Sequence, residues 1–340
     1  MIGRAIGSHV TLLVVAAAAA VFVWTRDKQA AVSAGEVTVW NGRPADVERL
    51  SFDSKARKLS LEARKDGQGT WWLGTSETMP AAAPDAGPPA PAKVTRFVSV
   101  GAAEKVVAGL APLKALREVG RIDENRSAEF GLKEPAGTLT VVVGGKARTL
   151  TLGDAMAAQM GGGARYLRDD ASATVYAVRP EVTRDLEYGE TSLIDRETHG
   201  FKDADVEGVR ISAHGKSRDI LRRGPESKRI WADPADPEKG DETVSNWLAK
   251  VDRLKPTEYP DPQPTAPEPI ARIDYSVKGT KGAFLEIAKV PSPPPVVSVT
   301  PAPPAPKSDY LVRSERTRLW AKVYAPVGEQ VEQDLGSVVR

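Results

Sequence analysis

The chain has 340 residues, and its 47 Lys and Arg against 45 Asp and Glu leave a formal net charge of only +2. So small a charge gives no long-range attraction to a phosphate backbone, and we expect no nucleic-acid partner. The chain has no cysteine and three histidines, which excludes disulfides, thiolate metal sites and cysteine nucleophiles. We therefore predict no catalytic residues, no cofactor-binding residues and no metal ligands.

An apolar run at Ile6–Trp24 precedes a charged stretch at residues 26–28. At about 1.5 Å per residue, such a run reaches roughly 28 Å, close to the hydrocarbon thickness of a bilayer. Small residues at 32–34 resemble a signal-peptide cleavage site, which leaves a cleaved signal as the alternative. We favour a retained anchor over residues 1–28, with 6–24 in the lipid bilayer. We predict a single-pass membrane protein whose C-terminal body lies outside the cytoplasm.

A tether at residues 29–46 leads to a pattern that recurs in the chain. Val47–Trp72 and Val206–Trp231 share apolar, acidic and aromatic positions at a constant offset of 159 residues. A shared spacing of this length indicates an internal duplication. The recurrence also explains Glu48 and Glu207 as repeated structural parts, which we prefer to a catalytic pair of carboxylates.

The first predicted unit spans residues 47–200 and carries a proline-rich insertion at 79–91. Strand patterns and turn residues predict strands at Val47–Phe52, Leu59–Ala63, Trp71–Leu73, Leu139–Val143, Thr149–Leu152, Tyr166–Arg168 and Val175–Val178. Apolar residues at helical spacing predict an amphipathic helix from Val106 to Leu116, which Pro112 bends or ends. A short helix at Pro180–Tyr188 closes the unit.

The second predicted unit spans residues 201–340 and repeats this order. Its predicted helices are Val244–Leu254 and Val327–Leu335, and its predicted later strands are Ile273–Val277, Phe284–Ile287, Tyr310–Val312 and Leu319–Val323. Proline-rich loops at 256–269 and 291–306 are expected to be solvated, with partner recognition as the alternative. We predict an α+β fold of two related units of antiparallel sheet plus helix, preceded by one N-terminal transmembrane helix.

Two short motifs imitate ligand-binding loops. Residues 215–217, Gly-Lys-Ser, resemble the end of a phosphate-binding loop, but Arg210 stands where that loop needs a glycine. The motif also lies between two predicted strands. Residues 203–208 resemble the opening of a calcium loop, whose twelfth residue should be a bidentate glutamate and is His214. We predict that neither motif binds its ligand.

A basic cluster lies between residues 216 and 229. Its members are Lys216, Arg218, Arg222, Arg223, Lys228 and Arg229. Such a hairpin could contact anionic headgroups or an acidic partner. We prefer the interpretation of an edge strand protected from aggregation by its charges.

The chain resembles a bacterial family known as domain of unknown function 4340. The resemblance rests on Phe130-Gly131-Leu132-Lys133-Glu134-Pro135, Leu150–Asp154, Tyr166–Arg168 and Val175–Val178, and it is clearest across residues 97–196. It implies a membrane-anchored protein of the bacterial inner membrane, single-pass with a periplasmic C-terminal body, that accompanies an ATP-binding cassette exporter of gliding-motility type. The resemblance implies no catalytic residues.

We therefore expect a non-catalytic accessory or scaffold subunit of a bacterial envelope complex, with an exporter subunit as its membrane-protein partner. The alternative is a cell-envelope polysaccharide-binding module, which would expose aromatic side chains in a groove. Burial of Trp40, Trp71, Trp247 and Trp320 should distinguish the two functions.

Overall fold

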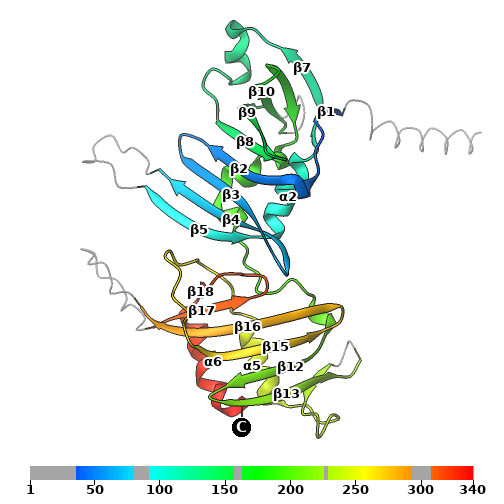
Figure 1. Cartoon of the computed structure of the whole chain (residues 1–340), viewed down its shortest axis with the longest axis vertical. Coiled ribbons are helices and arrows are strands. Elements are labelled where there is room, and N and C mark those ends of the chain that lie inside the picture. The colour runs from blue at the N-terminus through cyan, green and yellow to red at the C-terminus, as the bar shows by residue number, and fades with distance from the viewer. Residues whose placement is uncertain (1–35, 80–91, 157–162, 226–228, 293–307, 340) are drawn as a thin grey trace, which may run out of the picture.

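The computed structural model describes residues 36–79, 92–156, 163–225, 229–292 and 308–339. These residues form two units stacked along the long axis of the molecule, each an antiparallel sheet with helices against one face (Figure 1). Of the described residues, 47% lie in strands and 22% in helices. The fold is therefore mainly β.

The N-terminal unit is built on a sheet with the strand order β5-β4-β3-β2-β8-β9-β10-β11-β7. The strands are β2 (Val47–Asp53), β3 (Arg57–Asp66), β4 (Gly69–Thr78), β5 (Lys93–Ser99), β7 (Arg117–Arg121), β8 (Gly137–Val143), β9 (Lys146–Ala155), β10 (Arg165–Asp169) and β11 (Thr174–Val178). A separate small sheet pairs β1 (Val37–Trp40) with β6 (Leu113–Ala115). The helical segments are η1 (Pro44–Asp46), α2 (Gly101–Leu110), η2 (Glu124–Phe130), η4 (Pro180–Val182), α3 (Arg184–Tyr188) and α4 (Glu190–Leu193).

The C-terminal unit is built on a sheet with the strand order β14-β13-β12-β15-β16-β17-β18. The strands are β12 (Val206–Ala213), β13 (Lys216–Arg223), β14 (Ile230–Ala232), β15 (Pro269–Val277), β16 (Thr280–Pro291), β17 (Ser308–Ser314) and β18 (Ala321–Val323). The helical segments are η5 (Asp203–Asp205), α5 (Glu242–Val251) and α6 (Ala325–Val338).

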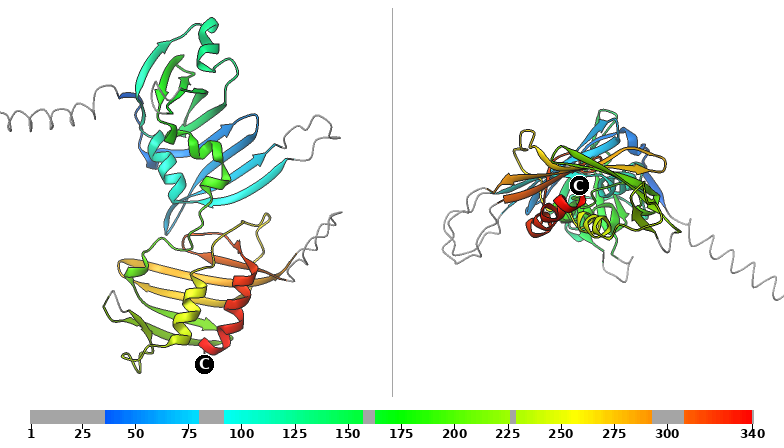
Figure 2. Two further views of the ribbon diagram at one scale, coloured as in Figure 1. Left: turned by 180° about the vertical axis from the view of Figure 1, so that it is seen from behind. Right: turned by 90° about the horizontal axis from the view of Figure 1, so that it is seen from below.

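Strand alternation turns one face of each sheet toward its helices. In β2, Leu50 and Phe52 are buried, whereas Ser51 between them points to the opposite face. Val106 and Leu110 of α2 cover the buried face of the N-terminal sheet and belong to the same apolar core. Figure 2 shows the helices of both units on one side of the molecule, so the other side consists of sheet.

Close packing of α6 on the C-terminal sheet depends on a glycine. A Cβ at Gly328 would lie 2.3 Å from Cγ of Tyr310, so only a glycine lets this part of α6 approach β17. Trp247 of α5 is buried and donates a hydrogen bond from Nε1 to the carbonyl oxygen of Val331, at 2.9 Å. The two helices therefore pack on the sheet as a pair.

The units meet through ion pairs, one of them made by an acid that a backbone hydrogen bond holds beside β5. Asp195 follows the last helix of the N-terminal unit, and its Oδ2 lies 2.9 Å from Nη2 of Arg316 in the C-terminal unit. The backbone N–H of Asp195 donates to the carbonyl oxygen of Val98 on β5, at 2.9 Å. Arg96 of β5 reaches Asp261 at 3.0 Å. The two ion pairs join strand β5 and the segment after α4 to loops of the C-terminal unit.

The predicted α+β fold class is wrong. The described chain is mainly β, in three sheets, because the strands extend well beyond their apolar centres while the helices stay short. The two larger sheets are also unequal, since β5 and β7 extend the N-terminal sheet at its edges. The order β4-β3-β2-β8-β9-β10-β11 nevertheless has the same sequence of neighbours as the C-terminal sheet.

The prediction of a transmembrane anchor and an inner-membrane location is also corrected. Among the helices of the described residues, none is long and apolar enough to cross a membrane. The longest, α6, has 14 residues and spans only about 21 Å at about 1.5 Å per residue. Residues 6–24, on which the prediction rested, lie outside the described residues, as do most of the proline-rich stretches 79–91 and 291–306.

Most predicted strands are confirmed, and the first helix ends before Pro112, which is one of the two outcomes expected for it. The hairpin of Val47–Phe52 with Leu59–Ala63 is formed by β2 and β3. Helix α2 ends at Leu110, and Leu113 begins β6 instead of continuing the helix. Pro112 accounts for this boundary, because proline lacks an N–H and disfavours helical conformation in the residue before it.

Candidate interaction surface

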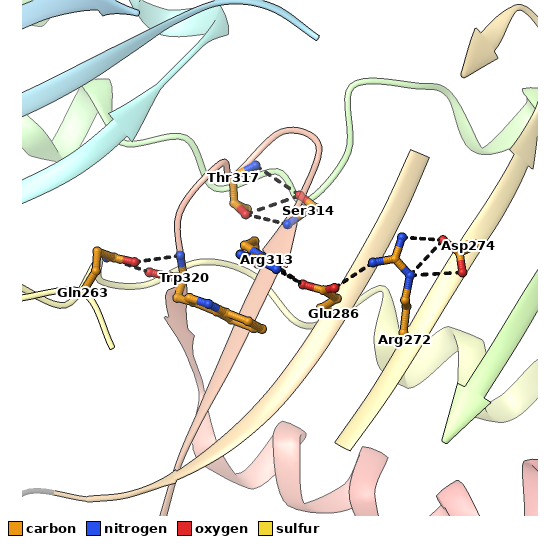
Figure 3. A network of polar contacts seen from close by, with 8 residues as sticks. All are labelled: Gln263, Arg272, Asp274, Glu286, Arg313, Ser314, Thr317 and Trp320. Atoms are coloured by element: carbon orange, nitrogen blue, oxygen red, sulfur yellow. Dashed lines mark hydrogen bonds and ion pairs between the residues drawn. The ribbon is translucent and has the colours of Figure 1, made fainter. Parts of the chain in front are cut away.

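A row of charged side chains crosses the open face of the C-terminal sheet (Figure 3). Glu286 on β16 stands directly opposite Arg272 on β15 and Arg313 on β17. Its carboxylate accepts from Arg272 Nη1 at 2.7 Å and from Arg313 Nη2 at 2.6 Å. Glu286 is buried between the two arginines, whose side chains are 42% and 41% exposed. The buried acid thus fixes two half-exposed guanidinium groups.

The same two guanidinium groups also stack on aromatic rings. Arg272 lies over the ring of Phe284 and Arg313 over that of Trp320, each 4.8 Å from the ring centroid. Trp320 is fixed in turn by Gln263, whose Oε1 accepts from the Trp320 backbone N–H at 2.9 Å. Cation–π stacking and ion pairing therefore immobilise the planar groups before any partner arrives.

The row continues onto the neighbouring strands of the same face. Arg272 also pairs with Asp274 at 2.7 Å. Arg210 on β12 stands opposite both Asp274 and Asp219, and its Nε donates to Asp219 Oδ1 at 2.7 Å. The hydrogen bond from Arg210 lowers the pKa of Asp219. We call the six residues Asp219, Arg210, Asp274, Arg272, Glu286 and Arg313 the charge ladder. Because acids and arginines alternate in it, the charge ladder carries little net charge.

A row of hydroxyl groups crosses the open face of the N-terminal sheet. Direct cross-strand pairing places five hydroxyl residues in line on five adjacent strands, in the order Thr149, Thr140, Ser51, Ser60 and Thr75. All five are half-buried, and no group within the described residues hydrogen-bonds to their hydroxyls. Adjacent strands lie about 4.8 Å apart, so the hydroxyl row offers evenly spaced donors and acceptors.

The charge ladder and the hydroxyl row face the same way. In Figures 1 and 2 the helices of both units lie behind the sheets when the open faces are viewed from the front. Strand alternation turns the ladder and the row away from those helices. Together they place polar side chains on the open faces of both units.

The basic cluster predicted between residues 216 and 229 is largely occupied by internal contacts. Arg218 Nη2 pairs with Asp241 at 2.8 Å and also reaches Asp233. Arg222 pairs with Asp203 at 2.6 Å and lies over the ring of Trp231. Strand β14 pairs with only Leu221–Arg223 of β13, so the interpretation of an edge strand holds for the first half of β13 and not for its second half. Lys228 lies outside the described residues.

The two motifs that resemble phosphate-binding and calcium-binding loops lie at the two ends of strand β12, where the chain turns. Gly215 lies in the turn between β12 and β13, and Lys216 and Ser217 begin β13; in this turn His214 and Gly215 have φ of 51° and 73°. Both values suit a tight hairpin turn. Residues 203–205 form η5, which enters β12 as η1 enters β2. Glu48 accepts from the backbone N–H of Gly145 at 2.9 Å and so supports the turn of the next hairpin.

The tryptophans chosen to distinguish the two functions are mostly buried. Trp40, Trp247 and Trp320 are 4%, 1% and 4% exposed. Trp71 is half-buried, and its place in β4 turns it to the same face as Thr75.

The family match extends across the junction of the two units. A family model described as a domain of unknown function (DUF4340) matches residues 100–271, which is half of the chain. The chain belongs to this family. No curated protein and no solved structure matches it. The DUF4340 match runs from α2 to β15, so it contains Arg210 and Asp219 of the charge ladder but not Glu286 or Arg313.

Sequence reasoning missed both polar rows. Their signal is present, since hydroxyl or charged residues alternate with apolar ones in each strand, as in Arg272-Ile273-Asp274. That alternation identifies the outward residues of one strand. It does not give the register between strands, which decides that Glu286 faces two arginines.

Proposed function

We propose that the protein is a non-catalytic accessory or scaffold subunit that docks a partner protein on the open face shared by its two sheets. An antiparallel sheet often leaves one face to solvent, so exposure of this face does not by itself indicate a docking site. The observation that carries the proposal is the pair Arg272 and Arg313, stacked on aromatic rings and locked by Glu286. Planar groups immobilised in advance lose little entropy on binding, and arginine is enriched at interfaces.

The partner that fits this surface is a polar protein surface with alternating acids and bases. The charge ladder presents both signs, so a partner of one strong sign would meet repulsion along half of it. Acids on the ladder accept from arginines, and a carboxylate whose pKa is lowered, as at Asp219, is a poor general base. The mixed charge of the ladder and the weak basicity of its acids both favour docking over catalysis. An exporter of gliding-motility type stays a prediction for the partner's identity.

Site-specific photo-crosslinking tests the proposal in the native host. A photoreactive residue at Ser60 or at Asp274 on the open face should give a discrete protein adduct. The same residue at Glu104, an exposed position of α2 on the helix side, is the matched control and should give none. Recovery of the chain without adducts, under conditions that preserve other complexes, would count against the proposal.

A polysaccharide-binding module is the second candidate, and the hydroxyl row favours it. The five hydroxyls in line have no hydrogen-bond partner in the part of the chain that the structure describes. With the half-buried Trp71 on the same face, they resemble a surface that can follow a sugar chain. Burial of Trp40, Trp247 and Trp320 speaks against an aromatic groove. Electrophoresis through gels that contain cell-envelope polysaccharide should retard the wild type and not Ser60→Lys, with Glu104→Gln, which also changes the net charge by +1, as the charge control.

A further inference from the structure

The charge ladder alternates in sign from one end to the other. Figure 1 shows β13, β12, β15, β16 and β17 stacked along the long axis of the molecule, so the ladder runs in that direction. In order along the face, its members are Asp219, Arg210, Asp274, Arg272, Glu286 and Arg313. The signs therefore read minus, plus, minus, plus, minus, plus, with the N-terminal unit beyond the Arg313 end.

This order of signs is its own complement when it is reversed. In a dimer with a two-fold axis, the same surface packs against itself and every contact occurs twice. If the axis lies across the ladder, Asp219 of each copy faces Arg313 of the other, and Asp274 faces Arg272. If the axis lies along the ladder, each residue faces its own counterpart, so like charges meet. The charges therefore select the arrangement in which the two ladders run in opposite directions.

The side chains that make these contacts are accessible. Asp219 is 53% exposed and Arg313 41%, and Asp274 is 44% exposed and Arg272 42%. Each can add a partner to those it has within the chain, because a carboxylate accepts several hydrogen bonds and a guanidinium donates five. Glu286 is buried, so it makes no contact with a second copy and serves only to hold Arg272 and Arg313 in place.

The residues beside the ladder on the same face are neutral. Ser212 stands opposite both Ser217 and Arg272, and Phe284 stands opposite Asp274. Strand alternation turns all of them to the open face. Two serines and one ring present no further charge, and the serines are small. A second copy can therefore approach the ladder here without meeting an unmatched charge.

We propose that the open face of the C-terminal sheet packs against the same face of a second copy of this chain, with the two charge ladders in opposite directions. The inference rests on the proposed function, because it names the protein that docks on this face. The mixed charge of the ladder matches the ladder itself and repels a partner of one sign. Because the ladders are reversed, the N-terminal units lie at opposite ends of the dimer, which leaves the hydroxyl row uncovered.

Sedimentation velocity of the purified full chain tests the dimer. The mean mass should rise with protein concentration from 36.4 kDa toward twice that value. The dimer should dissociate in about 1 M salt, because the screening length falls from about 10 Å at 0.1 M to about 3 Å. A chain that stays monomeric, or a dimer that salt strengthens, overturns the inference. Since the sample contains no other protein, either result leaves docking of a different protein, and so the proposed function, intact.

A charge reversal at the exposed end of the ladder tests the pairing. Asp219→Arg places like charges at both reciprocal contacts with Arg313, so the dimer Kd should rise tenfold or more. Glu104→Arg makes the same change of charge at an exposed position of α2 on the helix side and should keep the wild-type Kd. An unchanged Kd in a folded Asp219→Arg variant contradicts the proposed interface.

Photo-crosslinking of the purified chain tests the direction of the ladders. A photoreactive residue at position 219 should crosslink to the second copy near Arg313. Within one chain these positions lie four strands apart, or roughly 19 Å at about 4.8 Å per strand, which is beyond the reach of such a residue. Mass spectrometry of a mixture of isotopically heavy and light chains identifies the crosslink as intermolecular. A crosslink to residues around Asp219 of the second copy, or no crosslink in a sample that sediments as a dimer, overturns the arrangement.

Discussion

Nδ1 of His199 lies 3.0 Å from Oε1 of Glu315, although 116 residues separate them in the chain. His199 belongs to the segment that connects the units, and Glu315 follows the last residue of β17. Their contact therefore ties the connecting segment to the C-terminal sheet, beside the ion pair of Asp195 with Arg316.

Removal of the Glu315 carboxylate should destabilise the C-terminal unit. Glu315→Ala leaves both His199 Nδ1 and the Phe284 N–H without their acceptor in a buried place, which should lower the free energy of unfolding by about 2–3 kcal/mol. Urea denaturation followed by fluorescence measures the change. Glu104→Ala, at an exposed helical position, should stay within about 0.5 kcal/mol. Equal effects of the two substitutions would refute this role of Glu315.

The charge ladder should be far more sensitive at its buried centre than at its exposed end. Glu286→Gln removes the shared charge between Arg272 and Arg313 and should cost about 2–3 kcal/mol of stability. Asp219→Asn breaks an ion pair whose side chains are 60% and 53% exposed, and should cost less than about 1 kcal/mol. Thermal unfolding at low and high salt measures both, and comparable losses would contradict the assigned burial.

Two glycines of α6 should respond in opposite directions to the same substitution. Gly328→Ala places a Cβ against Tyr310, and overpacking of this kind typically costs about 1–3 kcal/mol. A Cβ at Gly336 meets nothing within 4 Å, so Gly336→Ala should stabilise the helix by about 0.5–1 kcal/mol. A shift of Tm in the same direction for both variants would show that α6 does not pack on β17 as described.

Tyr310 should contribute a loss of stability in alkaline solution. Burial raises the pKa of Tyr310 to about 12, and the hydrogen bond that its hydroxyl donates to Glu332 adds to the rise. The unfolded value is about 10, so the folded chain holds the proton more tightly. The stabilisation is complete below pH of about 10 and is lost as the pH rises toward the folded pKa.

Comparison with Tyr310→Phe isolates this contribution. The variant should be less stable than the wild type near pH 8 by about 1 kcal/mol, because the hydrogen bond to Glu332 is lost. The gap should narrow by roughly 1 kcal/mol between pH 9 and 11, since only the wild type then loses the tyrosine contribution. Urea denaturation over this range measures the gap, and a constant gap would disprove the proposed linkage.

Local signals in the sequence predicted the strands well and the fold class poorly. Alternating apolar residues identified β2, β3 and β8 because side chains on a strand point to opposite faces in turn. Apolar spacing alone would carry the first helix to Leu116, and Pro112, which was expected to bend or end it, accounts for its end at Leu110. The α+β class failed because strand ends such as Arg64–Asp66 carry no apolar pattern and form by pairing with β4.

The sequence by itself determined the family, the order of most strands and the outward residues of each. It could do so because propensity, alternation and turn residues act over a few neighbouring positions. Only the tertiary structure decided the charge ladder, the hydroxyl row and the contact of His199 with Glu315. The two rows depend on the register between strands, because a shift of one residue would turn their side chains to the other face. The contact depends on the packing of segments that lie far apart in the chain. The match of Glu315 to His199 is thus a property of the folded chain alone.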